Sequence, residues 1–199
     1  MNRYECFEFL APLIKDELVL GSLSGQRVEW DHLSRHEGNL LVACMGAALG
    51  IGMGLALVLP HRKVLVFESD GSMLLSLYNL PTLGNLNPLN LSVFVFDNEI
   101  YSGTRISEPT ATAGKTDLAA VARDCGIAMA TTVRDMNSFR DEATAALEQK
   151  GLRFVVCKID PTTQHRQIQR SNEDLSEHKY RFVRYLERTE GKRIFLGRG

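Results

Sequence analysis

Two apolar runs, separated by a segment of helical length, constrain the fold of this chain more than any other feature. Val64–Phe67 and Leu91–Phe96 have the apolar, β-branched composition of strands that are buried on both faces of a parallel sheet. Ser72–Leu86, between them, has the length and the apolar spacing of a helix. The three segments together predict a strand–helix–strand unit with two parallel strands.

Each of these two strands is followed by a side chain that offers oxygen, Asp70 after the first and Asn98 after the second. Ligands of such units bind at the carboxyl ends of the strands. A carboxylate and an amide there suit a hard divalent cation that keeps phosphate oxygens as its other ligands. The Gly71-Ser72 step opens the helix, where free N–H groups favour an anion. The residues therefore indicate a metal and phosphate site. Taken singly, Asp70-Gly71 would also be explained by a surface Asp-Gly turn, and Asn98 by an Asx turn.

The rest of the chain supplies further elements of the same kind. Short strands are predicted at Glu17–Leu20, Ala128–Thr132 and Phe154–Ile159. Helices are predicted at residues 3–16 with Asn2 as cap, at Thr116–Cys125 with Thr116 as cap, and at Asp135–Lys150. Within the first of these, Pro12 could end the helix early. The alternation predicts an α/β fold, a doubly wound and mostly parallel sheet with helices on both faces.

Length predicts one domain over residues 1–199. Residues 161–199 form a C-terminal extension in which Glu173–Glu190 is a charged helix, with Tyr180, Phe182, Val183 and Leu186 as its apolar residues. This extension has nine Lys or Arg against five Asp or Glu, but no block of lysines with aromatic residues between them. We therefore expect no nucleic-acid partner.

The four cysteines contain no Cys-x-x-Cys pair, which argues for a reducing compartment and against zinc or iron–sulfur clusters. The first ten residues contain two glutamates, unlike a secretory signal. Both observations predict a cytoplasmic protein.

Leu40–Leu59 contains no charged residue over 20 positions, the length of a membrane span. Gly46, Gly50 and Gly54 even follow the four-residue spacing of helices that pack in lipid. However, eight of the 20 residues are Gly or Ala, and the phosphate-type signals follow almost at once. We therefore expect a buried strand followed by a glycine-lined helix, and no membrane partner.

Ser69-Asp70-Gly71-Ser72 and Asp97-Asn98 resemble the Gly-Asp-Gly-Ser and Asn-Asn signature of thiamine diphosphate enzymes. This resemblance implies that Asp70, Asn98 and the carbonyl of Ile100 bind Mg²⁺, and that Gly71 and Ser72 contact the diphosphate. Ser69 replaces the first glycine and Asp97 the first asparagine, but neither position supplies a metal ligand in that family.

The segment before the glycine-lined helix, Leu41–Gly46, resembles the Ser-Met-Gly turn of thiamine decarboxylases. There an apolar side chain bends the cofactor into its reactive shape, and Met45 matches that position. The match also implies that the Ala43 carbonyl and the Met45 N–H bind the aminopyrimidine. We further assign Ser24 and Tyr101 to the cofactor site, although the loop that contains Ser24 is equally compatible with a plain turn.

Over nearly its whole length the chain resembles the β subunit of sulfopyruvate decarboxylase and the second half of phosphonopyruvate decarboxylase. The segments that carry this resemblance are Tyr4-Glu5, Arg35–Met45, Arg62–Asn98, Thr116–Gly126 and Glu177–Phe182. It implies a decarboxylase subunit for a small anionic 2-oxo acid, with thiamine diphosphate and Mg²⁺ as cofactors. It also implies a separate pyrimidine-binding α subunit, because the glutamate that protonates the aminopyrimidine belongs to that module.

Two other functions fit the same residues. One is a thiamine-dependent subunit for carboligation or acyl transfer, and the other is a non-catalytic cofactor-binding module whose site has drifted at Ser69 and Asp97. We expect an oligomer, and the same surface would also allow the chain purified alone to form a homo-oligomer.

Overall fold

The computed structural model describes residues 1–22, 25–101, 107–160, 168 and 174–195. Its main sheet has six parallel strands in the order β2-β1-β3-β4-β8-β7. In that order the strands are Asn39–Leu41, Leu18–Gly21, Val64–Ser69, Leu91–Asp97, Arg153–Lys158 and Met129–Val133. The two strands of the predicted strand–helix–strand unit, β3 and β4, are neighbours at the centre.

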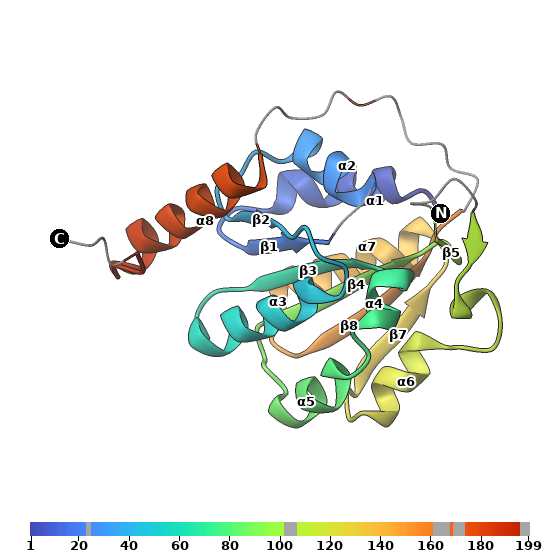
Figure 1. Ribbon diagram of the computed structural model, residues 1–199. Helices are drawn as coiled ribbons and strands as arrows, with labels where there is room; N and C mark the ends of the chain where they lie inside the picture. The colour runs from blue at the N-terminus through green and yellow to red at the C-terminus, as the bar shows by residue number, and fades with distance from the viewer. Residues whose placement is uncertain (23–24, 102–106, 161–167, 169–173, 196–199) are drawn as a thin grey trace.

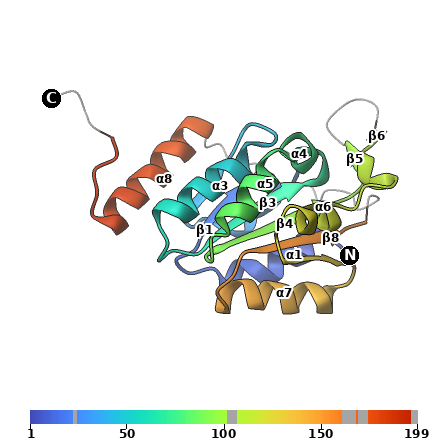
Figure 2. The same cartoon turned by 90° about the horizontal axis from the view of Figure 1, so that it is seen from below.

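Helices cover both faces of this sheet, as Figure 2 shows. One layer contains α3 (Ala47–Val58), α5 (Asn79–Leu86) and α6 (Leu118–Asp124), and the other contains α1 (Arg3–Leu10), α2 (Gly25–Leu33) and α7 (Met136–Glu148). The last helix, α8 (Leu175–Glu190), packs beside the edge strand β2 (Figure 1). The predicted α/β fold, with its doubly wound parallel sheet, is confirmed.

The central strands are buried because both of their faces meet a helical layer. Val64 and Val66 of β3 belong to the core under α3, whereas Leu65 and Phe67 point into an aromatic core under α1 and α7. All four side chains are at most 1% exposed. This burial on both faces explains why the strands are continuous apolar runs rather than alternating ones.

The uncharged stretch Leu40–Leu59 divides into β2, a turn and α3, as predicted. At Gly52 a Cβ atom would lie 2.3 Å from Cγ2 of Val66, so the absence of a side chain lets α3 approach β3 closely. Among the described residues, no helix is long and apolar enough to cross a membrane.

The helix predicted over Ser72–Leu86 is instead two helices, α4 (Asp70–Leu75) and α5. The break follows Ser76, whose hydroxyl donates to the carbonyls of Ser72 and Met73 and so competes with the helical hydrogen bonds. The predicted cap Thr116 is also wrong, because Asp117 accepts the N–H groups of Ala119 and Ala120 at the start of α6.

At the two ends of the chain the helix predictions also needed correction. Asn2 does cap α1, but the helix ends at Leu10 and a short 3-10 turn follows at Ala11–Leu13, where Pro12 lies. Of the four apolar residues named for α8, Phe182 and Leu186 are buried, Val183 is half-buried and Tyr180 is 51% exposed, whereas Tyr185 takes a buried position. Tyr185 lies on the face with Phe182 and Leu186, and Tyr180 does not.

Candidate functional site

The candidate site lies at the carboxyl ends of β3 and β4. The two strands are parallel and in register at Ser69 and Phe96, so that Asp70 and Asn98 leave the sheet from adjacent strand ends. Asp70 is 1% exposed at the first turn of α4. Ile100 begins a short antiparallel ribbon, β5 (Ile100–Tyr101) with β6 (Glu108–Pro109), which rises beside the strand ends (Figure 1).

Oxygen atoms of three residues converge at this point. One terminal atom of the Asn98 amide lies 3.0 Å from the carbonyl oxygen of Ile100 and 3.3 Å from Oδ1 of Asp70. When that atom is the nitrogen, it donates a hydrogen bond to each oxygen; when it is Oδ1, three oxygens face one another, as the ligands of a cation do. Neighbouring oxygens of an octahedral Mg²⁺ are about 3 Å apart, given metal–oxygen distances of about 2.0–2.1 Å. The spacing of the donors therefore fits Mg²⁺.

This donor set is small for a metal site made by protein alone. Within the described ranges, no three or more His, Cys, Asp or Glu side chains cluster at a spacing suited to a metal ion. Mg²⁺ is commonly held by one or two carboxylates together with phosphate oxygens. The arrangement thus suits a metal that arrives with a diphosphate.

A left-handed turn at Glu99 brings the Asn98 and Ile100 oxygens to the same place. Glu99 has φ +64°, a conformation that is strained for a side-chain-bearing residue. Its N–H donates to Oδ1 of Asp97 at 3.0 Å, and its carbonyl accepts the N–H of Thr110 at 2.9 Å. Strain of this kind persists where surrounding contacts hold it in place, and both contacts here come from the site itself.

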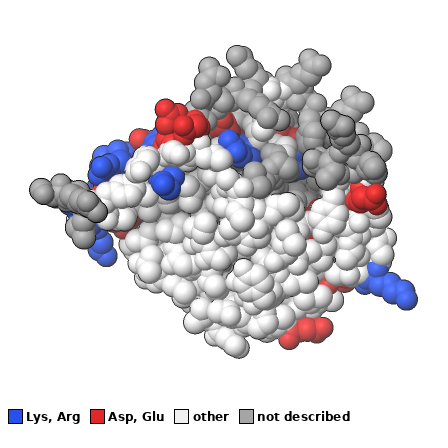
Figure 3. Space-filling view, in the orientation of Figure 1, with Lys and Arg blue, Asp and Glu red and all other residues white. Residues whose placement is uncertain are grey.

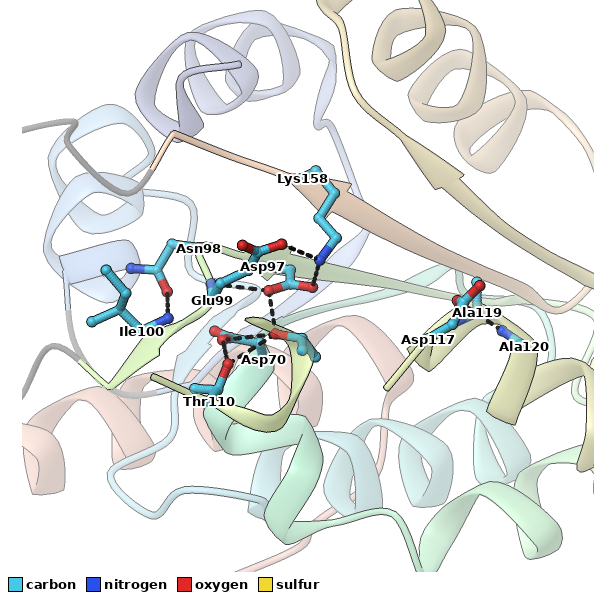
Figure 4. A network of polar contacts seen from close by, with 11 residues as sticks. Asp70, Asp97, Asn98, Glu99, Ile100, Thr110, Asp117, Ala119, Ala120 and Lys158 are labelled. Atoms are coloured by element: carbon cyan, nitrogen blue, oxygen red, sulfur yellow. Dashed lines mark hydrogen bonds and ion pairs between the residues drawn. The ribbon is translucent and has the colours of Figure 1, made fainter. Parts of the chain in front are cut away.

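Two threonine hydroxyls link the carboxylates of the site, and Figure 4 shows the contact of Thr110 with Asp70. Thr110 donates to Oδ2 of Asp70 at 2.7 Å, and Thr112 donates to Oδ1 of Asp97 at 2.7 Å. The two hydroxyl oxygens are 2.8 Å apart. Burial raises the pKa of Asp70 to about 6; the Thr110 hydrogen bond opposes this rise, and the charge of Asp97 adds to it. The site is therefore tuned as one connected network of carboxylates and hydroxyls.

The start of α4 is closely packed against the ribbon. Ser69 is the N-cap, and its Oγ accepts the N–H of Ser72 at 3.2 Å. A Cβ atom on Gly71 would lie 2.4 Å from Cε1 of Tyr101, so glycine is needed for the Tyr101 ring to lie against this turn. The sequence-predicted residues Gly71, Ser72 and Tyr101 are thus side by side.

The turn that contains Ala43 and Met45 is joined to the same helix start. Gly46, with φ +78°, donates its N–H to Oγ of Ser72 at 2.8 Å. Ala43 is exposed and Met45 is 38% exposed, so both offer atoms to a ligand. Beneath them the fully buried Glu68 accepts the N–H of Leu49 in the first turn of α3 at 3.1 Å, and burial raises the pKa of its carboxyl group.

Lys158 closes the network from the neighbouring strand β8. Its Nζ lies 2.7 Å from Oδ2 of Asp97 and 2.7 Å from Oε1 of Glu99 (Figure 4). Burial lowers the pKa of Lys158, but its hydrogen bonds and charge interactions with the two acids outweigh this and raise the pKa overall. Lys158 is therefore a fixed positive charge beside the carboxylates.

The structure gathers most of the predicted site residues at one edge of the sheet. The predicted metal ligands meet at one point, and the predicted turn and helix start are joined by the bond between Gly46 and Ser72. Two of the predicted residues lie outside the described residues: Ser24, and Arg105 in the loop after Asn98, which the family resemblance made a candidate contact for the second acidic group of the substrate.

The sequence analysis did not place three further residues in the site: Thr110, Thr112 and Lys158. Lys158 is the last residue of β8, and a strand-end position of this kind is the one signal that could have located it. Glu68 directly follows the apolar run Val64–Phe67 and was a candidate for the missing acid, the one that protonates the aminopyrimidine, only if the chain were active without a partner.

Comparison with known proteins agrees with this geometry. A family model described as thiamine pyrophosphate enzyme, C-terminal TPP binding domain, matches residues 25–157. Sulfopyruvate decarboxylase subunit beta of Methanococcus maripaludis is 29% identical over 189 residues, which cover 94% of this chain and 99% of that one. The subunit beta of Methanocaldococcus jannaschii is 32% identical over 146 residues, covering 73% and 76%.

Two larger proteins match over part of their length. Phosphonopyruvate decarboxylase of Streptomyces viridochromogenes is 33% identical over 153 residues, 76% of this chain and 38% of that protein. A solved structure, a putative thiamin diphosphate-dependent enzyme from Mycobacterium smegmatis, superposes with a TM-score of 0.64 at 17% identity, covering 81% of this chain and 32% of that chain. At this identity the superposition supports the fold alone.

The chain belongs to the thiamine pyrophosphate enzymes and contains their C-terminal TPP-binding domain. More particularly, it is a subunit of a thiamine-pyrophosphate-dependent decarboxylase, a carboxy-lyase. The resemblance to this family is therefore confirmed. The cofactor of the chain is thiamine pyrophosphate, which is also called thiamine diphosphate.

Proposed function

We propose that this chain is the diphosphate- and Mg²⁺-binding subunit of a decarboxylase that acts on a small 2-oxo acid with a second anionic group. The observation that carries the proposal is the convergence of Asp70, Asn98 and Ile100 at adjacent strand ends, with a spacing that fits Mg²⁺. The relatives named sulfopyruvate and phosphonopyruvate decarboxylase support the substrate class.

Different segments of this chain would bind the two ends of the cofactor. Asp70, Asn98 and the Ile100 carbonyl would hold Mg²⁺, and Gly71 and Ser72, together with Ser24 and Tyr101, would contact the diphosphate. Ala43 and Met45 would lie against the aminopyrimidine, with Met45 as the catalytic residue that sets the shape of the cofactor. When bound, thiamine diphosphate supplies the carbon nucleophile and the electron sink for decarboxylation.

We also propose that the enzyme needs a separate pyrimidine-binding subunit, which the name "subunit beta" of the relatives supports. No charged residue occurs in residues 38–60 or 71–96, which include α3, most of α4 and α5. The face these helices present in Figure 3 is correspondingly free of Lys, Arg, Asp and Glu over its centre. Exposed large apolar residues of these helices and of the turns beside them are Met45, Ile51, Leu57, Val58, Leu75, Tyr78 and Leu86.

An exposed apolar face of this kind marks an interaction surface. Met45 and Leu75 connect it to the cofactor site, so a partner seated on it would also cover the cofactor. The same face would allow the chain purified alone to form a homo-oligomer. A cytoplasmic location completes the proposal, and the free state of all four cysteines supports it.

The test is reconstitution with the pyrimidine-binding subunit encoded in the same genome. Carbon dioxide release from sulfopyruvate, phosphonopyruvate and pyruvate is measured with thiamine diphosphate and Mg²⁺. We expect release from one of the two anionic substrates with both subunits present, and none with either subunit alone. Robust turnover by this chain alone would refute the need for a partner, and a carboligation product in place of an aldehyde would refute the reaction class.

A further inference from the structure

Asp97 places a second carboxylate beside the proposed metal ligand Asp70. The thiamine diphosphate signature that this segment resembles has asparagine at this position, so the chain carries an additional negative charge in a buried place. Asp97 is 1% exposed, and its charge contributes to the raised pKa of Asp70. An unpaired carboxylate so close to the metal position would be a competing ligand, and burying it without a counter-charge would be unfavourable.

Both oxygens of Asp97 are already engaged. Oδ1 accepts the hydroxyl of Thr112 at 2.7 Å and the N–H of Glu99 at 3.0 Å. Oδ2 pairs with Nζ of Lys158 at 2.7 Å. Asp97 therefore has both oxygens occupied by groups of this chain and supports the loop that supplies the other ligands.

The sheet itself fixes the position of Lys158. β8 is parallel to β4, and Asp97 and Lys158 are register partners at the ends of these strands. The Lys158 side chain is only 19% exposed, and its second contact, at 2.7 Å, is Oε1 of Glu99. One ammonium group thus touches both Asp97 and the residue at the left-handed turn.

The turn at Glu99 is the element that this ammonium group stabilises. Its left-handed backbone brings the Asn98 side chain and the Ile100 carbonyl to one point, and its N–H is held by Asp97. We propose that Lys158 is a positioning residue for the Mg²⁺ site: it neutralises Asp97 and holds it and Glu99 so that Asn98 and Ile100 present their oxygens to the metal. This inference rests on the proposed function.

The test compares Lys158→Met, Asp97→Asn and the double variant Asp97→Asn/Lys158→Met. The double variant restores the Asn-Asn pair of the family signature without the salt bridge. Lys150→Met is the matched control, because Lys150 is exposed beyond the end of α7, near the opposite end of β8. Calorimetry on the full chain, alone and with its partner subunit, measures binding of Mg²⁺ with inorganic pyrophosphate and of Mg²⁺ with thiamine diphosphate.

We expect Lys158→Met to weaken binding of both probes at least about tenfold, and the double variant to return to within about threefold of the parent. Lys150→Met should bind like the parent. The denaturant midpoint without metal should fall in Lys158→Met and recover in the double variant, a readout that needs no cofactor. Lys158→Arg is added so that a variant that keeps the charge remains measurable even if Lys158→Met fails to fold.

Two results would overturn the inference while leaving the proposed function intact. One is a Lys158→Met variant that binds both probes as the parent does, and the other is a double variant that binds no better than Lys158→Met. A parent chain that binds neither probe, alone or with its partner, would instead refute the proposed function, and the inference with it.

Discussion

Replacing Asp70 by asparagine should make the metal-free protein more stable while it removes a carboxylate ligand of the proposed metal site. Burial raises the pKa of Asp70 from an ordinary 3.8 to about 6, so the ionised carboxylate opposes folding at neutral pH. The difference corresponds to about 3 kcal/mol of unfolding free energy at pH 7. The new amide would still accept the hydroxyl of Thr110, and its nitrogen would face the Asn98 amide.

The direction of the Asp70 pKa shift decides how the stability difference between Asp70→Asn and the parent changes with pH. The cost of the ionised carboxylate is fully present above the folded-state pKa of about 6. It disappears as the pH falls from there towards the unfolded-state value of 3.8, because Asp70 is then protonated in the folded state. The stability difference between Asp70→Asn and the parent should therefore be largest at neutral pH and vanish in acid. At neutral pH it should appear as a rise in melting temperature of about 6 to 12 °C at most for a chain of this size.

Bound ligand should make the parent more stable than Asp70→Asn, the reverse of the order without ligand. Thiamine diphosphate with Mg²⁺ at about a thousandfold excess over its dissociation constant adds about 4.1 kcal/mol to the parent, more than the variant's advantage of about 3 kcal/mol, and adds nothing to the variant. Thermal unfolding with and without this ligand, from acid to neutral pH, measures both effects. The exposed cap Asp135→Asn is the control; because asparagine caps helices equally well, its stability should change by less than about 0.5 kcal/mol. An Asp70→Asn variant less stable than the parent at neutral pH without ligand would refute the reasoning.

Three further predictions concern the packing around two glycines, the turn that contains Met45, and the affinity for Mg²⁺ at acidic pH. Gly84→Ala should lower the unfolding free energy by about 1–3 kcal/mol or more, because its Cβ would lie 1.9 Å from the carbonyl oxygen of Cys125. Gly54→Ala, whose Cβ would have no atom within 4 Å, should instead raise the unfolding free energy by about 0.5–1 kcal/mol. Denaturant titration of the isolated chain compares the two variants. Met45→Ala should leave the unfolding free energy within about 0.5 kcal/mol, because Met45 is 38% exposed, but lower decarboxylation by the reconstituted enzyme at least about tenfold; an active variant would remove Met45 from the catalytic site. Calorimetric affinity for Mg²⁺ with thiamine diphosphate should fall about tenfold per pH unit below a pH of about 6, because Mg²⁺ must displace a proton from Asp70, and a flat profile would contradict the ligand assignment.

Local patterns in the sequence were enough to predict the centre of the sheet and the meeting of Asp70 and Asn98, the side chains proposed to bind the metal. Apolar runs located β3 and β4, and the residues after them, Asp70 and Asn98, could be placed together because parallel strands end at the same edge. The break between α4 and α5 was missed because apolar spacing continues through it, while the cause is a hydroxyl, that of Ser76, that bonds back to the helix.

The support around the metal position was not predictable in the same way. Thr110 reaches Asp70 across 40 residues of sequence, and Lys158 reaches Asp97 only because β8 inserts beside β4. Contacts of this type follow from strand order, which no single segment of the chain encodes. The departure at Asp97 was visible in the sequence, but the counter-charge that accompanies it was not.

The order of the sheet also has a consequence for synthesis on the ribosome. β8 lies between β4 and β7, although it is made after both. Strands β1 to β4 can pair once Asp97 has emerged, but β7, within the sheet that the structure describes, has β8 as its strand partner and must wait for Arg153–Lys158. Until then the growing chain presents an open β4 edge and an unpaired β7, the kind of exposed strand that chaperones protect. Pulse-labelling hydrogen exchange during refolding should therefore find the β7 amides protected together with those of β8, and never before them.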